Sequence, residues 1–170
     1  MEPLWLPLVI AVVVMLLLFR ASKVVPVGHV FLVERLGRYR TSLKPGIHLT
    51  VPVIDTVRAT LDTREQMFST SREPVVTKDN HVLAVDAGVH YEITDPRAAV
   101  YEVADHLQAL DTITVSTLRT VIGGMDREEA LMSSQVIGTE LRRVLNWTTG
   151  TWGVRVNRAD ITALDEAGQL

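Results

Sequence analysis

The sequence predicts an α+β fold, in which a half rich in strands is followed by a half rich in helices. Residues 24–94 are rich in valine, threonine and short turn signals, whereas residues 95–149 carry apolar residues at helical spacing, and a strand-like segment follows. Strands that precede helices, rather than alternating with them, are typical of α+β domains. The length of 170 residues, 47% of them hydrophobic, fits one domain of ordinary size with an appendage.

The first half consists of short strands separated by turns. The sheet region opens at Val24-Val25-Pro26-Val27-Gly28, and residues 29–36 form a first strand. Lys44-Pro45-Gly46 predicts a type II turn, because proline fits the second position and glycine the positive φ of the third. Two further short strands are expected at residues 47–53 and 56–61.

The clearest strand is Val82–Thr94, in which apolar and polar residues alternate, so that one face is wet. The turn Lys78-Asp79-Asn80 joins it as a hairpin to Val75-Val76-Thr77. The positions expected to face the core are Leu83, Val85, Ala87, Val89, Tyr91 and Ile93.

Three helices are indicated by their capping residues. Asp95-Pro96 starts a short helix, and a second runs from the capping pair Asp105 and Gln108 to Gly123-Gly124. Asp126 and Glu129 repeat that capping pattern for a third helix. The stripes expected to face the core are Leu107, Leu110, Ile113, Leu118 and Val121 in the second helix, and Leu131, Ile137, Leu141, Val144 and Leu145 in the third.

The final strand follows Trp152-Gly153-Val154. Its apolar phase slips between Val156 and Ala159, as a β-bulge would produce. We expect Pro45, Gly46 and Gly153 to shape turns on which the sheet depends.

The segment Leu4–Phe19 carries no charge and is bounded by Glu2 and Arg20. As a helix it covers roughly 24 Å of a hydrocarbon core of ~30 Å, and flanking residues such as Trp5 add interfacial length. A secretory signal peptide is the alternative reading, but the amino-terminal region is acidic and no small-residue cleavage pattern follows the apolar run. We therefore expect residues 1–23 to form one transmembrane helix that anchors the chain.

Basic residues dominate the stretch after the apolar segment, where Glu34 is the one acid before residue 44. The excess of positive charge favours a single-pass topology with the soluble domain in the cytoplasm. The same group can also contact anionic lipid headgroups. The basic residues are Arg20, Lys23, Arg35, Arg38, Arg40 and Lys44.

Composition and motifs argue against several classes of function. A formal net charge of −3 is unsuited to nucleic-acid binding, and the absence of cysteine excludes disulfides, thiolate catalysis and cysteine-ligated metals. The common hydrolase, nucleotide and dinucleotide signatures are missing from the sequence. We predict that the protein is not an enzyme and has no catalytic, cofactor-binding or metal-binding residues.

Three weaker signals have ordinary explanations. His90 shares a strand face with Asp86 and Glu92, where a metal cluster is conceivable but a solvated face is favoured. Asn146-Trp147-Thr148 matches the N-glycosylation pattern, which in a cytoplasmic domain is a chance match. Trp147 and Trp152 can stack a base or sugar, yet we expect them to close the sheet against the preceding helix.

Nine short blocks follow one another along the chain in a distinctive order. They are Val25-Pro26-Val27-Gly28, Val33-Glu34-Arg35-Leu36-Gly37-Arg38-Tyr39, Leu43-Lys44-Pro45-Gly46-Ile47-His48, Val51-Pro52-Val53-Ile54-Asp55, Leu61-Asp62-Thr63-Arg64-Glu65-Gln66, Thr77-Lys78-Asp79-Asn80, Tyr91-Glu92-Ile93-Thr94-Asp95-Pro96, Leu118-Arg119-Thr120-Val121-Ile122-Gly123 and Trp152-Gly153-Val154-Arg155-Val156. Together they resemble the stomatin family, in the wider stomatin/prohibitin/flotillin group, also called SPFH or band 7. The resemblance covers roughly Val24 to Ile161, nearly all of the chain after the apolar segment.

The resemblance implies an SPFH domain at residues 24–162 that is attached to membrane lipids at the cell membrane. It implies a scaffold that forms homo-oligomers and organises membrane microdomains or modulates other membrane proteins. Several bacterial relatives hold a membrane protease or are encoded with one, so the alternative is an accessory regulatory subunit of a membrane protease.

The family usually continues into a long coiled-coil helix, whereas here residues 163–170 form a short tail. The nine residues after Ile161 hold no heptads, so we expect no long carboxy-terminal coiled coil in this chain, which is either a naturally short member or a fragment. Without that helix, self-association is expected to be weak and dependent on the membrane.

Overall fold

The computed structural model describes residues 9, 11–12, 15–16, 22–51 and 54–166. The chain divides into two compact units at Thr63 and Arg64, which we call unit 1 and unit 2 and describe separately. Of the anchor predicted at residues 1–23, the described residues 9, 11–12 and 15–16 are helical, whereas residues 22–23 are already part of a strand, so the predicted helical extent is wrong there; the other residues of the anchor lie outside the described residues. Within the described ranges, no helix has the length and apolar character needed to cross a membrane.

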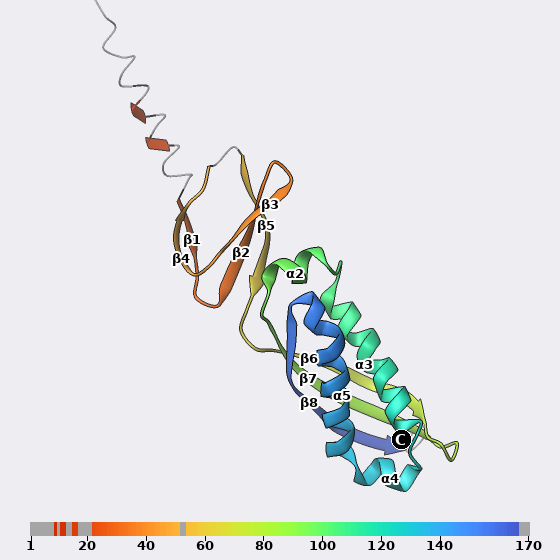
Figure 1. The fold of residues 1–170 in the computed structure, drawn as a ribbon. Helices are drawn as coiled ribbons and strands as arrows, with labels where there is room; N and C mark the ends of the chain where they lie inside the picture. Colours follow the sequence, from red (N-terminus) through yellow and green to blue (C-terminus); the bar gives the residue numbers. More distant parts are fainter. Residues whose placement is uncertain (1–8, 10, 13–14, 17–21, 52–53, 167–170) are drawn as a thin grey trace, which may run out of the picture. The chain divides into compact units, whose positions relative to one another are not determined.

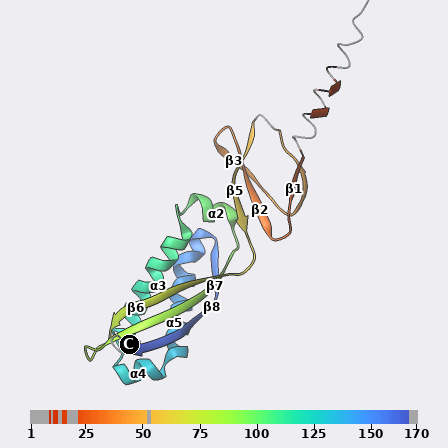
Figure 2. The ribbon, with the colours of Figure 1, turned by 180° about the vertical axis from the view of Figure 1, so that it is seen from behind.

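Unit 1 is built from five strands in two small antiparallel sheets (Figures 1 and 2). The first sheet pairs β1 (Ser22–Val25) with β4 (Gly46–Leu49). The second has the order β3-β2-β5, with β2 at His29–Arg35, β3 at Arg38–Leu43 and β5 at Asp55–Asp62. Its core cluster is small and consists of Val25, Val33 and Leu43, with Phe31 and Val57 packed against them.

Unit 2 contains a three-stranded antiparallel sheet of order β6-β7-β8. The strands are β6 (Gln66–Val76), β7 (Val82–Ile93) and β8 (Val154–Glu166). β7 is central and shows the predicted alternation, because its six predicted core residues are all buried. The predicted hairpin between β6 and β7 is confirmed, with Val76 opposite Val82.

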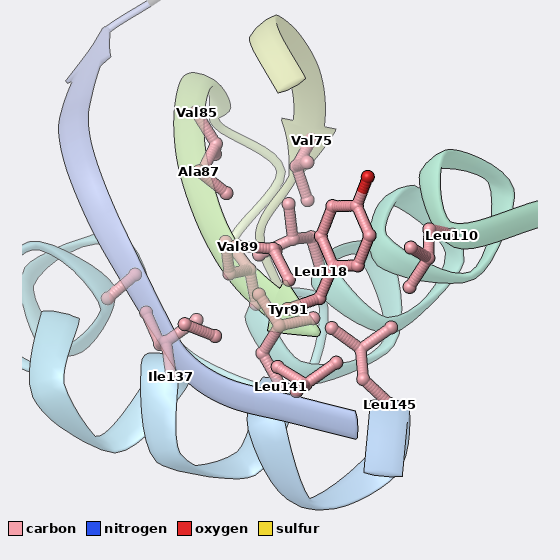
Figure 3. Packing of buried hydrophobic residues seen from close by; sticks show 14 of the residues in the cluster. Val75, Val85, Ala87, Val89, Tyr91, Leu110, Leu118, Ile137, Leu141 and Leu145 are labelled. Carbon is pink, nitrogen blue, oxygen red and sulfur yellow. The ribbon is translucent and has the colours of Figure 1, made fainter. Parts of the chain in front are cut away.

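Four α-helices lie between β7 and β8 in the chain: α2 (Pro96–Tyr101), α3 (His106–Ile122), α4 (Arg127–Met132) and α5 (Ser134–Thr149). A short 3-10 turn, η1 (Gly150–Trp152), joins α5 to β8. α3 and α5 cover one face of the sheet, where they bury Leu110, Leu118, Ile137, Leu141 and Leu145 against β7 (Figure 3). The α+β class predicted from the sequence is thus confirmed.

The local signals at Asp95, Asp105 and Gly123 and the signal for the bulge are confirmed, whereas Asp126, although it is the N-cap residue of α4, makes no side-chain capping hydrogen bond. The Asp95 carboxylate accepts hydrogen bonds from the backbone N–H of Arg97 and Ala98 at the start of α2, and Asp105 caps α3 in the same way. Gly123 is the C-cap of α3. In β8 the register shifts between Val156 and Arg158, which leaves Asn157 as the extra residue of a bulge.

Several predicted helical positions are wrong. The predicted third helix is two helices, α4 and α5, because the chain turns at Ser133. The row of core-facing residues predicted for this helix therefore does not continue from α5 back to Leu131. Leu131 is exposed and Ala130 is buried in its place. Leu107 is also exposed, since the core contacts of α3 begin one turn later at Leu110.

Strand bounds also differ from those predicted. Gly46 has the expected positive φ of 138°, but it is already the first residue of β4, and β4 ends at Leu49. β6 begins ten residues before Val76, and its bulge places Arg72 at a φ of 50°. β8 continues to Glu166, so that residues 163–166, expected as the start of a tail, pair with β7.

Candidate functional site

The tip of the β2–β3 hairpin presents an apolar side chain in an unfavourable backbone conformation. Leu36 and Gly37 form a two-residue turn with φ values of 51° and 77°, as in a type I′ turn. Positive φ is easy for glycine and tolerable for asparagine, but it brings the Cβ of leucine close to its own backbone. Leu36 is nevertheless 80% exposed, so no packing within the described residues compensates for this strain.

Two more exposed apolar residues lie at the same end of unit 1. Leu49 ends β4 and pairs with Ser22, the first residue of β1. Val51 is in the following loop, which approaches the hairpin through a hydrogen bond from Leu36 N to the carbonyl of Ile54. We call Leu36, Leu49 and Val51 the apolar rim of unit 1, and the exposed cross-strand pair Val24 and Ile47 continues it along β1 and β4.

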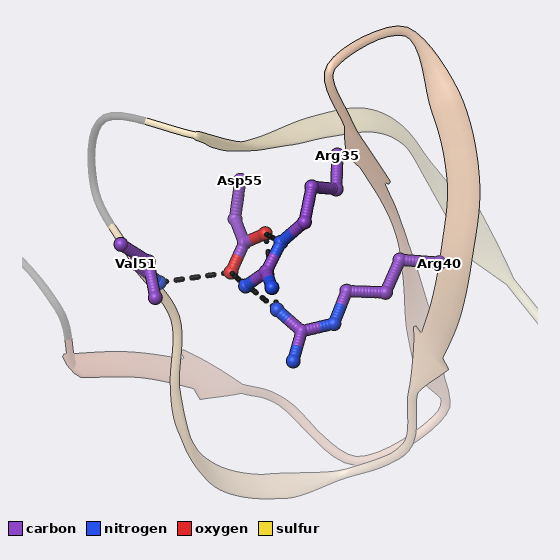
Figure 4. A network of polar contacts seen from close by, with 4 residues as sticks. All are labelled: Arg35, Arg40, Val51 and Asp55. Carbon is purple, nitrogen blue, oxygen red and sulfur yellow. Dashed lines mark hydrogen bonds and ion pairs between the residues drawn. The ribbon is translucent and has the colours of Figure 1, made fainter.

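A buried carboxylate holds this end of unit 1 together (Figure 4). Asp55 accepts two hydrogen bonds from Arg35, at 2.7 and 3.0 Å, and two from Arg40, at 3.2 and 3.0 Å. It also accepts one from the backbone N–H of Val51, at 2.9 Å, and its side chain is only 3% exposed. One carboxylate therefore fixes the hairpin arms and the loop that carry the rim.

The partners of Asp55 favour its charged form. The backbone N–H of Val51 and the guanidinium of Arg35 lower the pKa of Asp55 below its ordinary value of 3.8, although burial opposes them. Because the pKa of Asp55 is lowered in the folded state, the ionised carboxylate stabilises the fold at pH values above its ordinary pKa of 3.8. This stabilisation is lost as the pH falls from 3.8 through the lowered pKa. We call Asp55 and its three partners, Arg35, Arg40 and the N–H of Val51, the Asp55 clamp. The clamp is thus fully formed at neutral pH.

We expect Asp55→Asn to lower the melting temperature by several degrees at pH 7, because two guanidinium groups lose their shared counter-charge. The difference from the unchanged chain should shrink below pH 3.8 as Asp55 itself becomes protonated. Thermal unfolding followed by circular dichroism between pH 2 and 7 measures this, with the exposed Asp165→Asn as control. Equal melting temperatures at pH 7 would contradict the role given to the clamp.

The clamp changes the count of free basic residues near the rim. Arg35 and Arg40, two of the six basic residues expected to face lipid headgroups, share the charge of Asp55 instead. Lys23 and Arg38 are exposed near the rim, whereas Lys44 is exposed at the opposite end of the strands, two residues before Gly46, which pairs with Val25. Arg20 lies outside the described residues.

The polar groups singled out in the sequence do not assemble into a metal site. Nδ1 of His90 lies 3.9 Å from a carboxylate oxygen of Glu65, and Glu92 faces Arg155 at 3.5 Å. In the part of the chain that the structure describes, no three His, Asp or Glu side chains are grouped as metal ligands.

The tryptophans and Asn146 occupy different positions from those expected. Trp147 is 86% exposed, so the expectation that it closes the sheet is wrong, because its position on α5 faces away from the core. Trp152 is partly buried and lines a shallow pocket with residues of α3. The Asn146 amide donates to the carbonyl of Val156 at 2.7 Å and accepts from its N–H at 2.9 Å, which gives this residue a structural role.

The rim and the clamp were both missed by reasoning from the sequence. The signal for the rim was the dipeptide Leu36-Gly37 between two strand-like arms, where a two-residue hairpin loop would favour asparagine or glycine in the first position. The clamp had no local signal, because Arg35 and Asp55 are twenty residues apart.

Fold and surface together define an α+β protein with a small β unit that exposes an apolar rim and a second unit in which helices cover a sheet. The chain belongs to the SPFH domain / Band 7 family, which matches residues 23–169. The stomatin-like character indicated by the sequence blocks is confirmed by this match and by similarity to stomatin homologs.

Relatives occur in bacteria and archaea. An uncharacterized protein of Mycobacterium tuberculosis is 38% identical over 157 residues, which are 92% of this chain and 41% of that protein. One of Methanothermobacter thermautotrophicus is 36% identical over 165 residues, 97% of this chain and 52% of its own length. A stomatin homolog of Pyrococcus horikoshii is 29% identical over 153 residues, 90% of this chain and 57% of its own length. The chain spans about half the length of these relatives.

Proposed function

We propose that the protein is a membrane-attached scaffold that self-associates and organises membrane regions or modulates other membrane proteins. Membership of the SPFH family supports a scaffold-like role. The observation that carries the proposal of membrane contact is Leu36, an exposed leucine kept in a strained turn. Strain that persists without a packing reason points to a functional constraint at that residue.

Attachment in this proposal has two parts. The charge-free segment Leu4–Phe19 is a single-pass anchor, and the apolar rim rests in the headgroup region beside it. Burial of one leucine side chain in an apolar medium contributes ~1.5–3 kcal/mol, so the rim alone supports only reversible contact. Lys23 and Arg38, which lie at the rim end of unit 1, add attraction to anionic lipids, each by ~1 kcal/mol when close to the surface.

The excess of basic residues after the apolar segment supports a cytoplasmic location of unit 2 in this proposal, where unit 2 is available for contacts with other copies or proteins. The protein performs no chemistry of its own in this proposal. Chemical cross-linking of the full chain in the membrane, before purification in detergent, distinguishes the scaffold from the alternative role. A scaffold is cross-linked to further copies of itself, whereas cross-linking to one dominant membrane protease would favour an accessory subunit.

Vesicle flotation tests the two parts of the attachment separately. The full chain should float with vesicles and resist carbonate extraction, and deletion of residues 1–19 should abolish that resistance. The shortened chain should retain weak binding to anionic vesicles, which Leu36→Asn reduces about ten- to a hundredfold, as expected for a side-chain burial of ~1.5–3 kcal/mol. Carbonate-resistant binding without residues 1–19 would show that the anchor is wrongly assigned.

Leu36→Asn should at the same time raise stability, by up to about 1 kcal/mol, because asparagine adopts positive φ at lower cost. Val27→Asn is the matched control, since Val27 is 86% exposed but lies in the turn after β1, at the far end of that strand from Ser22. A loss of binding shared by Val27→Asn would contradict a specific contact at the rim.

A further inference from the structure

The outer face of α5 carries four residues in a regular stripe, which we call the α5 stripe. Its members are Val136, Glu140, Arg143 and Trp147, and their spacing of four, three and four residues puts them on one side of the helix. The opposite side of α5 buries Ile137, Leu141 and Leu145 in the core (Figure 3).

Both apolar residues of the stripe face solvent. Trp147 is 86% exposed and Val136 is 59% exposed, and both belong to a helix that is firmly packed on its other side. Tryptophan is the residue type most enriched among side chains that dominate protein interfaces. An indole held on a rigid helix therefore offers a preformed contact.

The order of residues in the α5 stripe is symmetric about its midpoint. Glu140 and Arg143 flank the midpoint at equal distances, and Val136 and Trp147 lie equally far from it on either side. The stripe thus has an apolar residue at each end and opposite charges in the middle, over roughly 16 Å of helix at ~1.5 Å per residue.

We propose that the α5 stripe is the contact between two copies of this chain, packed antiparallel about a two-fold axis that passes by the midpoint. This inference rests on the self-association in the proposed function and names the surface that provides it. In an antiparallel pair, Trp147 lies at the level of Val136 of the second copy, and Glu140 at the level of Arg143 of the second copy. A two-fold contact of this kind requires a self-complementary surface, and the stripe has that property.

The charges select the antiparallel arrangement over the parallel one. Within one chain, the Arg143 guanidinium donates to the Glu140 carboxylate at 2.8 and 2.5 Å. An antiparallel copy adds a second pair beside the first, so that positive and negative groups alternate in a group of four. A parallel copy would set Glu140 against Glu140 and Arg143 against Arg143, which like-charge repulsion opposes.

The contact is small, because one helix face contributes well under the ~800 Å² per partner of a typical stable interface. We therefore expect weak pairing in solution and stronger pairing on a membrane, where confinement raises the effective concentration of the copies.

Charge reversal separates contact between copies from effects within one chain. Glu140→Arg gives a stripe with two positive groups, and Arg143→Glu gives one with two negative groups. Each variant alone should pair at least tenfold more weakly than the unchanged chain, and an equimolar mixture of the two should recover pairing. Recovery on mixing is not expected if the Glu140–Arg143 ion pair only stabilises its own helix.

The experiment uses the full chain in phospholipid vesicles. Because the chain has no cysteine, Ser116→Cys, at an exposed position of α3, takes a single donor or acceptor dye in every protein tested. Energy transfer between copies then reports pairing as a function of protein-to-lipid ratio. Trp147→Ser should weaken pairing at least tenfold, and circular dichroism verifies that each variant is folded.

Arg155→Glu is the matched control, because Arg155 is an exposed arginine of β8 whose ion-pair partner, at 3.5 Å, is Glu92 of β7 and not a residue of α5. It should leave energy transfer unchanged. The inference is overturned if the charge reversals leave pairing unchanged or if their mixture does not recover it. If either of these results is obtained while the unchanged chain does pair, the protein self-associates, but through a surface other than the α5 stripe. If it shows no pairing although it floats with vesicles, self-association fails as well while membrane attachment stands.

Discussion

Gly153→Ala is expected to destabilise unit 2 by about 2–5 kcal/mol, the largest effect among the substitutions that we propose. Gly153 has a φ of 67°, where a residue with a Cβ costs ~1–2 kcal/mol. A Cβ at this position would also lie 2.4 Å from the carbonyl oxygen of Asp95, which is backbone and cannot move aside by a rotamer change. Overpacking of this kind adds ~1–3 kcal/mol.

The damage should extend beyond the site of the added methyl group. The Gly153 carbonyl accepts hydrogen bonds from the backbone N–H of Thr94 at 2.8 Å and of Asp95 at 3.0 Å. Asp95 in turn caps α2, so a shift at Gly153 disturbs the end of β7 and the start of the helix together.

Urea unfolding of the full chain measures this loss. Gly150→Ala is the control, because Gly150 has ordinary helical dihedral angles and no atom within 4 Å of an added Cβ. It should be neutral or slightly stabilising. If both variants unfold at the same urea concentration, the close approach of Gly153 to Asp95 is wrong.

Gly138→Ala is expected to destabilise by about 1–3 kcal/mol, although glycine-to-alanine changes inside helices normally stabilise by ~1 kcal/mol. At this position alanine is expected to destabilise the protein instead, because a Cβ on Gly138 would lie 2.5 Å from the backbone oxygen of Ala159 in β8. Gly138 therefore sets how closely α5 approaches the strand. The methyl group must separate helix and strand, which opens the contacts of Ile137 and Leu141 with the core.

Thr139→Ala, at the next and exposed position of α5, provides the comparison in the same unfolding measurement. We expect Thr139→Ala to raise the free energy of unfolding slightly, because alanine has a better helix propensity than threonine. If Gly138→Ala also gains stability, α5 does not touch β8 at that point.

The parts of the fold that were predictable from the sequence depend on neighbours along the chain. The alternation in β7, the caps at Asp95 and Asp105 and the bulge at Asn157 all follow from periods or pairs within a few residues. The break between α4 and α5 was not predicted, because Asp126 and the residues after it fit one continuous helix as well as two.

The missed features depend on contacts between distant segments. β1 pairs with β4, so that Ser22 meets Leu49, and Asp55 meets two arginines on another strand and hairpin arm. Nothing in the local pattern distinguishes Asp55 from a solvated turn residue. Likewise, the apolar character of Trp147 suggested a core position, whereas its helical phase relative to Ile137 and Leu141 places it outside.

The hydrogen bonds of Asn146 have a consequence for aggregation. β8 is an edge strand, and an exposed edge is a template on which strands of other molecules can polymerise. The amide of Asn146 reproduces the donor and acceptor of a neighbouring backbone, and it occupies both polar groups of Val156. The bulge at Asn157 and the charges of Arg155 and Arg158 further interrupt the regular ladder that an incoming strand needs. The first part of β8 is thus protected against the addition of strands from other molecules.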